Sequence, residues 1–358
     1  MHIKTFAVAA VGLGLVTLSA CGSSPSDKGS AGSKTVTLVS HNSWAASKGV
    51  IADFETSSGY KVKVLEDGDA GQAVNKAILT KDNPQGDVFF GVDNTLLSRA
   101  LDNGLFQPYE PKGADLILPR YRVDEAKHRV TPIDTGDICV NYDKKYFADH
   151  KLTPPASFDD LIKPEYKNLL VTENAATSSP GLGFLLGTAA KYGDQGWQDY
   201  WKKLKANGVK VVDGWEQAYN QEFSGSAGGR KAKGDRPLVV SYASSPPAEV
   251  IYAEPRPKTA PTGVAQGTCF RQVEYAGLLS NARNTEGGKA FLDFLITKKF
   301  QDDMPLNMFV YPVREGAQVP AEFAEYGPQA KNPETLAPDR IAANRDQWVK
   351  SWTSLVLR

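Results

Sequence analysis

From residue 35 onward, the hydrophobic pattern alternates between two periods. Short runs that are continuously apolar, or that alternate apolar and polar residues, predict strands. Apolar residues at helical spacing follow each of the first three runs. The predicted elements are strand 35–40, helix 49–57, strand 61–65, helix 71–80, strand 87–92 and helix 96–103. This strand–helix order favours a mostly parallel sheet with helices on both faces.

The middle of the chain repeats this rhythm. Strands are predicted at 138–142, 168–171, 209–212, 238–241 and 272–279, and helices at 158–162, 181–192, 195–207, 286–297 and 340–355. Between them, the Gly-rich and basic segment 225–236 predicts a solvated loop, with a docking patch as the alternative.

Composition narrows the class of protein. The chain has 358 residues, enough for two lobes with their own cores, and its 41 basic residues balance 41 acidic ones. Such a balance argues against a general nucleic-acid binder. The chain contains no P-loop, GxSxG elbow or HExxH motif, so we predict no catalytic residue and no metal site. Three cysteines are too few for a disulfide scaffold or a structural zinc cluster.

The first residues have the pattern of an export signal. Lys4 precedes an apolar run at 6–18, which is too short to span a bilayer, and the run ends in Leu-Ser-Ala-Cys. This ending resembles a bacterial lipobox, which implies cleavage after residue 20 and a diacylglycerol on Cys21. We therefore predict a lipoprotein signal peptide at 1–20, with a plain secretory signal as the alternative. The protein would then be extracytoplasmic and lipid-anchored to the cell membrane.

Residues 21–34 are rich in Gly and Ser, and we predict a flexible tether there. Two cysteines remain beyond the tether, Cys139 and Cys269, each in a strand-like run. An exported protein permits a disulfide between them, and two separate buried thiols are the alternative.

Six segments taken together resemble the periplasmic thiamine-binding proteins of ABC importers. They occur in the family's order with similar spacing, and the resemblance covers residues 35–357. The segments are LEDG at 65–68, GVDNTLL at 91–97, SSPGLG at 178–183, GWEQAY at 214–219, VVSYASSP at 239–246 and YPV at 311–313.

The resemblance implies a two-lobed α/β fold of the type II periplasmic-binding class, whose lobes close on a ligand about a strand hinge. Lobe 1 would comprise residues 35–138 and a return segment at about 270–310, and lobe 2 would comprise 139–268. A helical segment at 311–358 would pack on the lobes. Cys139 and Cys269 would both lie at the hinge.

The resemblance also implies a non-enzymatic, monomeric binding protein that needs no cofactor and binds no nucleic acid. Its ligand would be thiamine, thiamine monophosphate or thiamine diphosphate. Its partners would be an ABC permease with a cytoplasmic ATPase, and the membrane through its lipid.

The start of the helix near residue 181 is a candidate oxyanion site. The exposed amides of Gly181 and Leu182 would bind the oxyanion together with the hydroxyls of Ser178 and Ser179. Pro180 suits a first helical turn, and glycine allows close backbone approach. The resemblance places this stretch near the phosphate or hydroxyethyl end of the ligand. A capped helix without a ligand is the alternative.

The other candidate ligand contacts are aromatic or acidic. The resemblance implies that Trp215, Tyr219, Tyr242 and Phe309 provide aromatic faces, on which a ring cation is attracted. Asp67 matches a family carboxylate, although Asp-Gly is also a common turn pair. Asp93, at the end of a buried strand, is either a ligand contact or a helix cap.

The chain also departs from the family pattern. His41 stands where relatives carry Tyr, Lys48 where they carry an aromatic residue, and Ala248 where Tyr is expected. A lysine at the mouth would favour a phosphorylated ligand, or it would point to water. The choice between thiamine, its phosphate esters and a pyrimidine fragment therefore stays open.

Three other classes compete with a thiamine-type binder. A ferric-ion or small-anion binder of the same superfamily is the first, although the chain lacks the adjacent tyrosines common in ferric binders. An exported hydrolase is the second, but His41, His128 and His150 lie in no recognisable triad context. A purely structural surface lipoprotein is the third.

Overall fold

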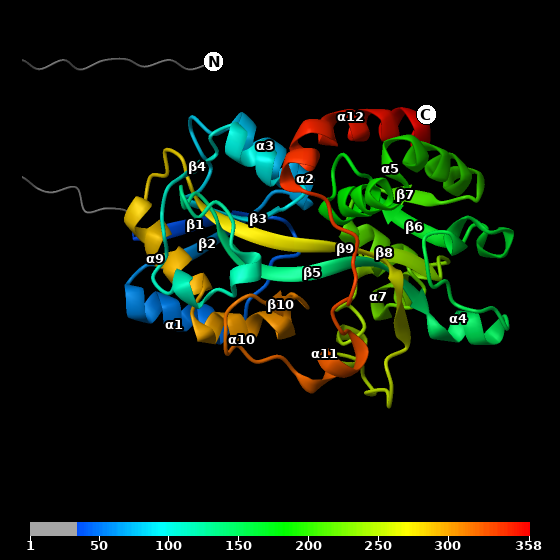
Figure 1. Cartoon of the computed structure of the whole chain (residues 1–358). Coiled ribbons are helices and arrows are strands. Elements are labelled where there is room, and N and C mark those ends of the chain that lie inside the picture. The colour runs from blue at the N-terminus through cyan, green and yellow to red at the C-terminus, as the bar shows by residue number, and fades with distance from the viewer. Residues whose placement is uncertain (1–33) are drawn as a thin grey trace, which may run out of the picture. The chain divides into compact units, whose positions relative to one another are not determined.

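The computed structural model describes residues 34–358 (Figure 1). The predicted signal peptide, Cys21 and all of the predicted tether except Lys34 lie outside the described residues. Within the described part, no helix is long and apolar enough to cross a bilayer.

The first group of strands is parallel. Strands β1 (Thr35–Ser40), β2 (Lys61–Glu66) and β3 (Val88–Asp93) lie in the order β2-β1-β3, and helices α1 (Lys48–Ser58) and α2 (Ala70–Leu79) connect them. The chain adds β2 on one side of β1 and then returns past β1 to add β3 on its other side. Because parallel crossovers are right-handed, α1 and α2 cover opposite faces.

Local signals explain where these two helices begin and end. The Ser47 side chain accepts a hydrogen bond from the Val50 amide at the start of α1, and Gly59 ends that helix in the left-handed region at φ 74°. Helix α2 starts with a capping box between Asp69 and Gln72. The periodicity predicted both helices to within one residue at each end.

The second group of strands is also parallel. Strands β6 (Leu170–Glu173), β7 (Lys210–Val212) and β8 (Leu238–Tyr242) lie in the order β8-β6-β7, and the long helix α5 (Ser179–Ala206) packs against them. Gly193 is non-helical within α5, at φ 71° and ψ 178°. This break explains why the pattern predicted two helices, at 181–192 and 195–207.

Two long antiparallel strands join the groups. Strands β5 (Thr131–Asp143) and β9 (Thr262–Leu279) pair with each other, β9 pairs with β3, and β5 pairs with β8. The resulting path is β2-β1-β3-β9-β5-β8-β6-β7. The prediction of mostly parallel pairing therefore holds for the outer strands but not for the centre of the sheet.

Only parts of β5 and β9 were predicted, at 138–142 and 272–279. The rest of β5 reads Thr-Pro-Ile-Asp-Thr-Gly-Asp, in which proline, glycine and two carboxylates interrupt the apolar pattern. All seven of these residues are buried. Tertiary packing overrides the local signal here.

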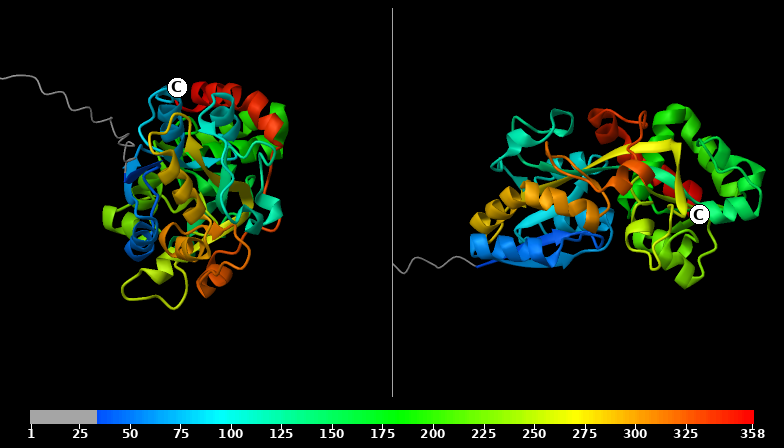
Figure 2. Two further views of the ribbon diagram at one scale, coloured as in Figure 1. Left: turned by 90° about the vertical axis from the view of Figure 1, so that its left-hand side faces the viewer. Right: turned by 90° about the horizontal axis from the view of Figure 1, so that it is seen from below.

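Further elements cover the sheet. The helices α9 (Thr285–Leu295) and α10 (Lys298–Asn307) lie beside α1 (Figure 2). Helix α12 (Pro338–Val356) packs on both α5 and α3 (Leu97–Asp102), and the Trp352 ring meets Trp201 of α5 edge-on. The remaining elements are β4 (Phe106–Gln107), α4 (Lys144–Asp149), α6 (Trp215–Gln217), the π-helical turn Ala218–Glu222, α7 (Ala227–Ala232), α8 (Ala248–Ile251), β10 (Tyr311–Pro312), α11 (Ala321–Tyr326) and the 3₁₀ turns Ala114–Leu116, Pro119–Tyr121, Asp160–Ile162 and Pro164–Tyr166.

The prediction of a solvated loop at 225–236 is wrong for its central part, which forms helix α7. Ser226 caps this helix by accepting a hydrogen bond from the Gly229 amide, and its hydroxyl donates to the Tyr219 carbonyl. Gly229 is buried so tightly that an added Cβ would lie 1.6 Å from the Phe223 carbonyl oxygen. The glycines that resembled a flexible loop are therefore required by close packing.

The structure joins Cys139 of β5 to Cys269 of β9 in a disulfide. Both sulfurs are buried, together with Ala243 and Ala330. The bond ties together the two strands that run between the two parallel groups.

Candidate ligand-binding site

A pocket of about 450 Å³ opens where the carboxyl ends of the parallel strands meet. His41 follows β1, Asp69 follows β2, Ser179 follows β6, Trp215 follows β7 and Tyr242 ends β8, and all five line it. Open α/β sheets bind ligands at this edge. The volume suits a small organic molecule.

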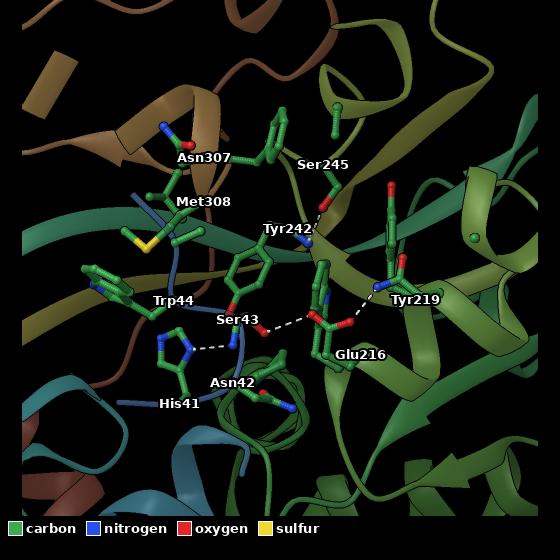
Figure 3. Close-up of a pocket in the computed structure, with 18 of the residues that line it drawn as sticks. His41, Asn42, Ser43, Trp44, Glu216, Tyr219, Tyr242, Ser245, Asn307 and Met308 are labelled. Carbon is green, nitrogen blue, oxygen red and sulfur yellow. Dashed lines mark hydrogen bonds between the residues drawn. The ribbon is translucent and has the colours of Figure 1, made fainter. Parts of the chain in front are cut away.

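Both parallel groups contribute to the walls. Figure 3 shows Tyr242 in the middle of the view, with Trp44 and Met308 on one side and Glu216 and Tyr219 on the other. The Ser43 hydroxyl, from the loop after β1, lies 3.4 Å from Glu216 Oε1 of α6, and this hydrogen bond is among those that link the two sides.

Aromatic rings supply much of the lining. Trp215 stacks on Tyr219 with ring centroids 5.1 Å apart and a 15° angle between the planes, and its Nε1 donates to Ser241 Oγ at 2.8 Å. Tyr252 is 62% exposed and meets Phe309 edge-on. Because Tyr252 is exposed and its neighbour Phe309 also lines the pocket, the pair offers apolar surface to an entering molecule.

The carboxylate of Asp69 is the hydrogen-bond centre of the inner wall. Its oxygens accept from the amides of Ala70 (2.6 Å), Trp215 (2.9 Å) and Ser179 (3.4 Å) and from the Ser178 hydroxyl (3.0 Å). Burial is the largest influence on this group and raises its pKa, while these donors oppose the rise.

Asp93 lies behind Asp69 and is fully buried. One oxygen accepts from the amides of Thr95 and Leu96, and the other accepts from the hydroxyl of Ser179 and the amide of Gln272. Asp93 does not line the pocket, and the two amides that it binds come before α3 (Leu97–Asp102), whose N-cap residue Leu96 has no side-chain capping hydrogen bond.

A third acidic group faces His41. Glu274 of β9 lies opposite Asp134 of β5 in the sheet register, and its Oε1 is 3.3 Å from His41 Nε2. The His41 Nδ1 accepts from the Ser43 amide. Burial by itself lowers the pKa of His41, but the carboxylates of Glu274, Asp69 and Asp93 together outweigh burial, so the net pKa is raised.

The charge of the lining is strongly one-sided. Four carboxylates line the pocket, namely Asp69, Glu216, Glu249 and Glu274, whereas no lysine or arginine of residues 34–358 does. The one imidazole is already paired with Glu274. Glu249 accepts from the Ala227 amide and the Tyr219 hydroxyl. An entering cation would meet negative charge from both parallel groups.

The predicted site residues divide into two sets. Those that line the pocket are Ser179, Trp215, Tyr219, Tyr242 and Phe309, and those that do not are Asp67, Asp93, Ser178 and Gly181. Asp67 instead pairs with Lys76 on α2, and Gly181 is buried against the Glu173 carbonyl. Lys48 is exposed and does not line the pocket, whereas Ala248 does.

Sequence reasoning missed Asp69, Trp44, Tyr252 and the glutamates. A signal for Asp69 was present, because an Asp three positions before Gln and directly before a helical run is typical of a capping box. The pocket positions of Glu249 and Glu274 carried no local signal, since only the sheet register and the packing of α8 bring them to the pocket.

At the predicted oxyanion site, the serine donors already have acceptors, the Leu182 amide donates to the Ser178 carbonyl, and Gly181 does not line the pocket. The Ser178 hydroxyl and the Ser179 amide donate to Asp69, the Ser179 hydroxyl donates to Asp93, and Pro180 has no amide proton. Within residues 34–358, no group of three or more His, Cys, Asp or Glu side chains is arranged to hold a metal ion.

Comparison with known proteins places this geometry in a family. A model described as bacterial extracellular solute-binding protein matches residues 83–248. Over 327 residues, the chain is 30% identical to the thiamine-binding periplasmic protein of Salmonella typhimurium strain LT2, and the alignment covers 90% of this chain and 94% of that relative. The chain belongs to the bacterial extracellular solute-binding proteins.

Solved structures of this family share the fold. A structure titled periplasmic thiamin binding protein superposes with a TM-score of 0.78 at 28% identity and covers 90% of this chain and 96% of that one. The iron uptake protein A1 of a Synechocystis strain is a more distant relative, 22% identical over 325 residues, with 88% of this chain and 86% of that protein covered. The predicted two-lobed α/β fold of a solute-binding protein is confirmed.

Proposed function

We propose that this protein captures thiamine, delivers it to a membrane permease and carries out no chemistry. The observation that carries the proposal is the pocket lining, which combines aromatic faces with four carboxylates and lacks lysine and arginine among the described residues. Thiamine joins a cationic thiazolium to a flat aminopyrimidine, and both parts match such a lining. The similarity to thiamine-binding periplasmic proteins supports the same ligand.

The energetics favour a cation over an anion or a neutral solute. A cation over an aromatic face gains about 0.5–2 kcal/mol, and more when it is desolvated. Trp215, Tyr219 and Tyr242 are half-buried or buried rings from the second parallel group. Glu216 of α6 and Glu274 of β9 both line the pocket, so their carboxylates neutralise a ring cation that binds there, without a mobile counter-ion.

Capture occurs by closure of two lobes. Lobe 1 comprises residues 35–138 with the return segment at about 270–310, lobe 2 comprises 139–268, and residues 311–358 pack on both. The path of β5 and β9 between the two parallel groups supports a hinge within these strands. Helix α12 contacts both α3 of lobe 1 and α5 of lobe 2, which supports the packing of the C-terminal segment on both lobes.

The protein acts as a monomer outside the cytoplasm. A diacylglycerol on Cys21 anchors it to the cell membrane, and the tether at 21–34 holds the lobes near an ABC permease, which a cytoplasmic ATPase drives. The lipobox-like sequence before Cys21 and the periplasmic naming of the relatives support this location.

Titration calorimetry on the mature protein tests the ligand. Thiamine is expected to bind with a Kd of about 1 μM or below. Ferric ion and inorganic phosphate, which represent the iron and small-anion alternatives, are expected to give no heat. A thermal-shift series with the same ligands checks the ranking independently.

Two matched variants test the site. Trp215→Leu removes a lining ring and is expected to weaken thiamine binding by about tenfold, the loss of one cation–π contact with its buried area. Tyr326→Leu removes a ring that does not line the pocket, and it is expected to leave the Kd unchanged. An absence of thiamine binding by the folded protein, or a visible charge-transfer band with iron, would overturn the proposal.

A further inference from the structure

The start of α5 is the place in this pocket where a phosphate group would ordinarily bind. Helix N-termini attract anions through free amide protons and the helix dipole, and Ser179 at this terminus lines the pocket. The helix has 28 residues, so its terminus is fully developed. What the terminus holds in this chain is a carboxylate of the protein itself.

Asp69 takes up the donors of this terminus. It reaches them from the end of β2, where it also caps α2, and it accepts from the Ser178 hydroxyl and the Ser179 amide. The amide of Trp215, at the start of α6, donates to the same carboxylate. Three chain segments therefore direct their hydrogen-bond donors at Asp69 rather than at the pocket interior.

The remaining hydroxyl is also occupied. Ser179 Oγ donates to Asp93, and Gln272 Nε2 lies 2.7 Å from the same oxygen. No lysine or arginine of residues 34–358 lines the pocket, and the His41 imidazole, whose pKa is raised, is paired with Glu274. A phosphate at this end of the pocket would therefore meet the Asp69 carboxylate, while both serine hydroxyls and the Ser179 amide already have acceptors.

Building on the proposed function, we propose that Asp69 determines specificity by occupying the anion position at the start of α5, so that the pocket accepts thiamine as its free alcohol and rejects its phosphate esters. A phosphate monoester brings about −1.5 to −2 charges at neutral pH. Placed beside Asp69, this charge is repelled and leaves its oxygens without donors. The hydroxyethyl group of thiamine carries no charge and donates one hydrogen bond, which a carboxylate oxygen accepts.

The first test compares ligands on the wild-type protein. Titration calorimetry with thiamine, thiamine monophosphate and thiamine diphosphate is expected to give a Kd for each ester at least about tenfold weaker than for thiamine, and equal or tighter binding of the esters overturns the inference. If thiamine itself does not bind, the proposed function fails. If thiamine and its esters bind equally, the inference alone fails.

The second test changes the residue. Asp69→Ser keeps a favourable helix cap for α2, removes the charge and frees the donors of α5, so the preference for thiamine over its monophosphate is expected to shrink at least about tenfold. Asp82→Asn removes an exposed carboxylate that does not line the pocket, and the wild-type preference is expected to persist. A folded Asp69→Ser variant with the wild-type preference overturns the role of Asp69. If that variant does not fold, the wild-type ligand ratio decides.

Discussion

Two buried carboxyl groups near the pocket differ sharply in their surroundings. Asp69, in the helix-start cluster with Ser178, Ser179 and the Trp215 amide, accepts four hydrogen bonds. Asp134, in the acid pair with Glu274, receives no hydrogen bond from any amide, amine or hydroxyl group of the described residues. Both residues are nevertheless buried, Asp134 completely and Asp69 with 9% of its surface exposed.

The difference shows that donors, and not burial alone, decide what a buried acid does. Burial raises the pKa of both groups, but donors oppose the rise at Asp69, whereas the Glu274 charge adds to it at Asp134. Asp160 completes the comparison, because it is only partly buried and accepts from two amides, a hydroxyl and Lys163. The Lys163 side chain, followed by the other donors, lowers the pKa of Asp160 to about 2.

The largest effect on the free energy of unfolding is expected from truncating Asp69, the acid with four hydrogen-bond donors. Asp69→Ala leaves buried donors unpaired and removes the cap of α2, so the free energy of unfolding is expected to fall by about 3 kcal/mol. Urea denaturation of the ligand-free protein measures this loss. Asp82→Ala, at an exposed position, is the matched control and is expected to change stability by less than about 0.5 kcal/mol. A loss below about 1 kcal/mol for Asp69→Ala would contradict the comparison.

A stabilising effect is expected from replacing Asp134, the acid without amide, amine or hydroxyl donors among the described residues. The folded pKa of Asp134 lies above its unfolded value, so the folded state holds the proton more tightly and this contribution to stability is lost as the pH rises. Asparagine resembles the protonated form and does not titrate. Asp134→Asn is therefore expected to be more stable than the wild type at pH 8, by about 1–2 kcal/mol, with a smaller gain at pH 5.

Urea denaturation at both pH values measures this gain. A gain that is equal at pH 5 and pH 8, or larger at pH 5, would show that Asp134 is not held in its neutral form by burial and by Glu274.

The smallest effect is expected at Asp160, the partly buried acid. Because the folded pKa of Asp160 lies below its unfolded value, its contribution is present above about pH 4 and is lost as the pH falls toward 2. Solvent screens this group, so Asp160→Asn is expected to cost only a few tenths of a kcal/mol at pH 7. Denaturation curves at pH 7 and pH 2 compare the two proteins, and a cost that persists at pH 2 would argue against an electrostatic origin.

Much of the outer fold was predictable because its signals are local. The period-two runs of β1 and β2, the caps of α1 and α2, and the Pro180 start of α5 depend on residues close in sequence. The site was predictable in part for the same reason, since Trp215, Tyr219 and Tyr242 stand in the GWEQAY and VVSYASSP segments that carry the family resemblance.

The remaining features depend on contacts between distant segments. Glu274 reaches the pocket only because β9 inserts between β3 and β5, and the acid pair exists only in that register. The Ser178 hydroxyl and the Ser179 amide, at the predicted oxyanion site, donate to Asp69, which is 109 residues away from Ser178 in the chain. No periodicity or motif around Ser178 and Ser179 predicts that Asp69 is their partner.

The sequence by itself determined the strand and helix order, the two groups of parallel strands and the aromatic character of the pocket lining. Short-range periodicity and capping encode the first two, and the order of the motifs encodes the third. Only the tertiary structure decided the sign of the charge at the bottom of the pocket. That sign depends on which carboxylates the crossing strands bring beside the start of α5 and on whether donors remain there, and such long-range pairing leaves no trace in local sequence.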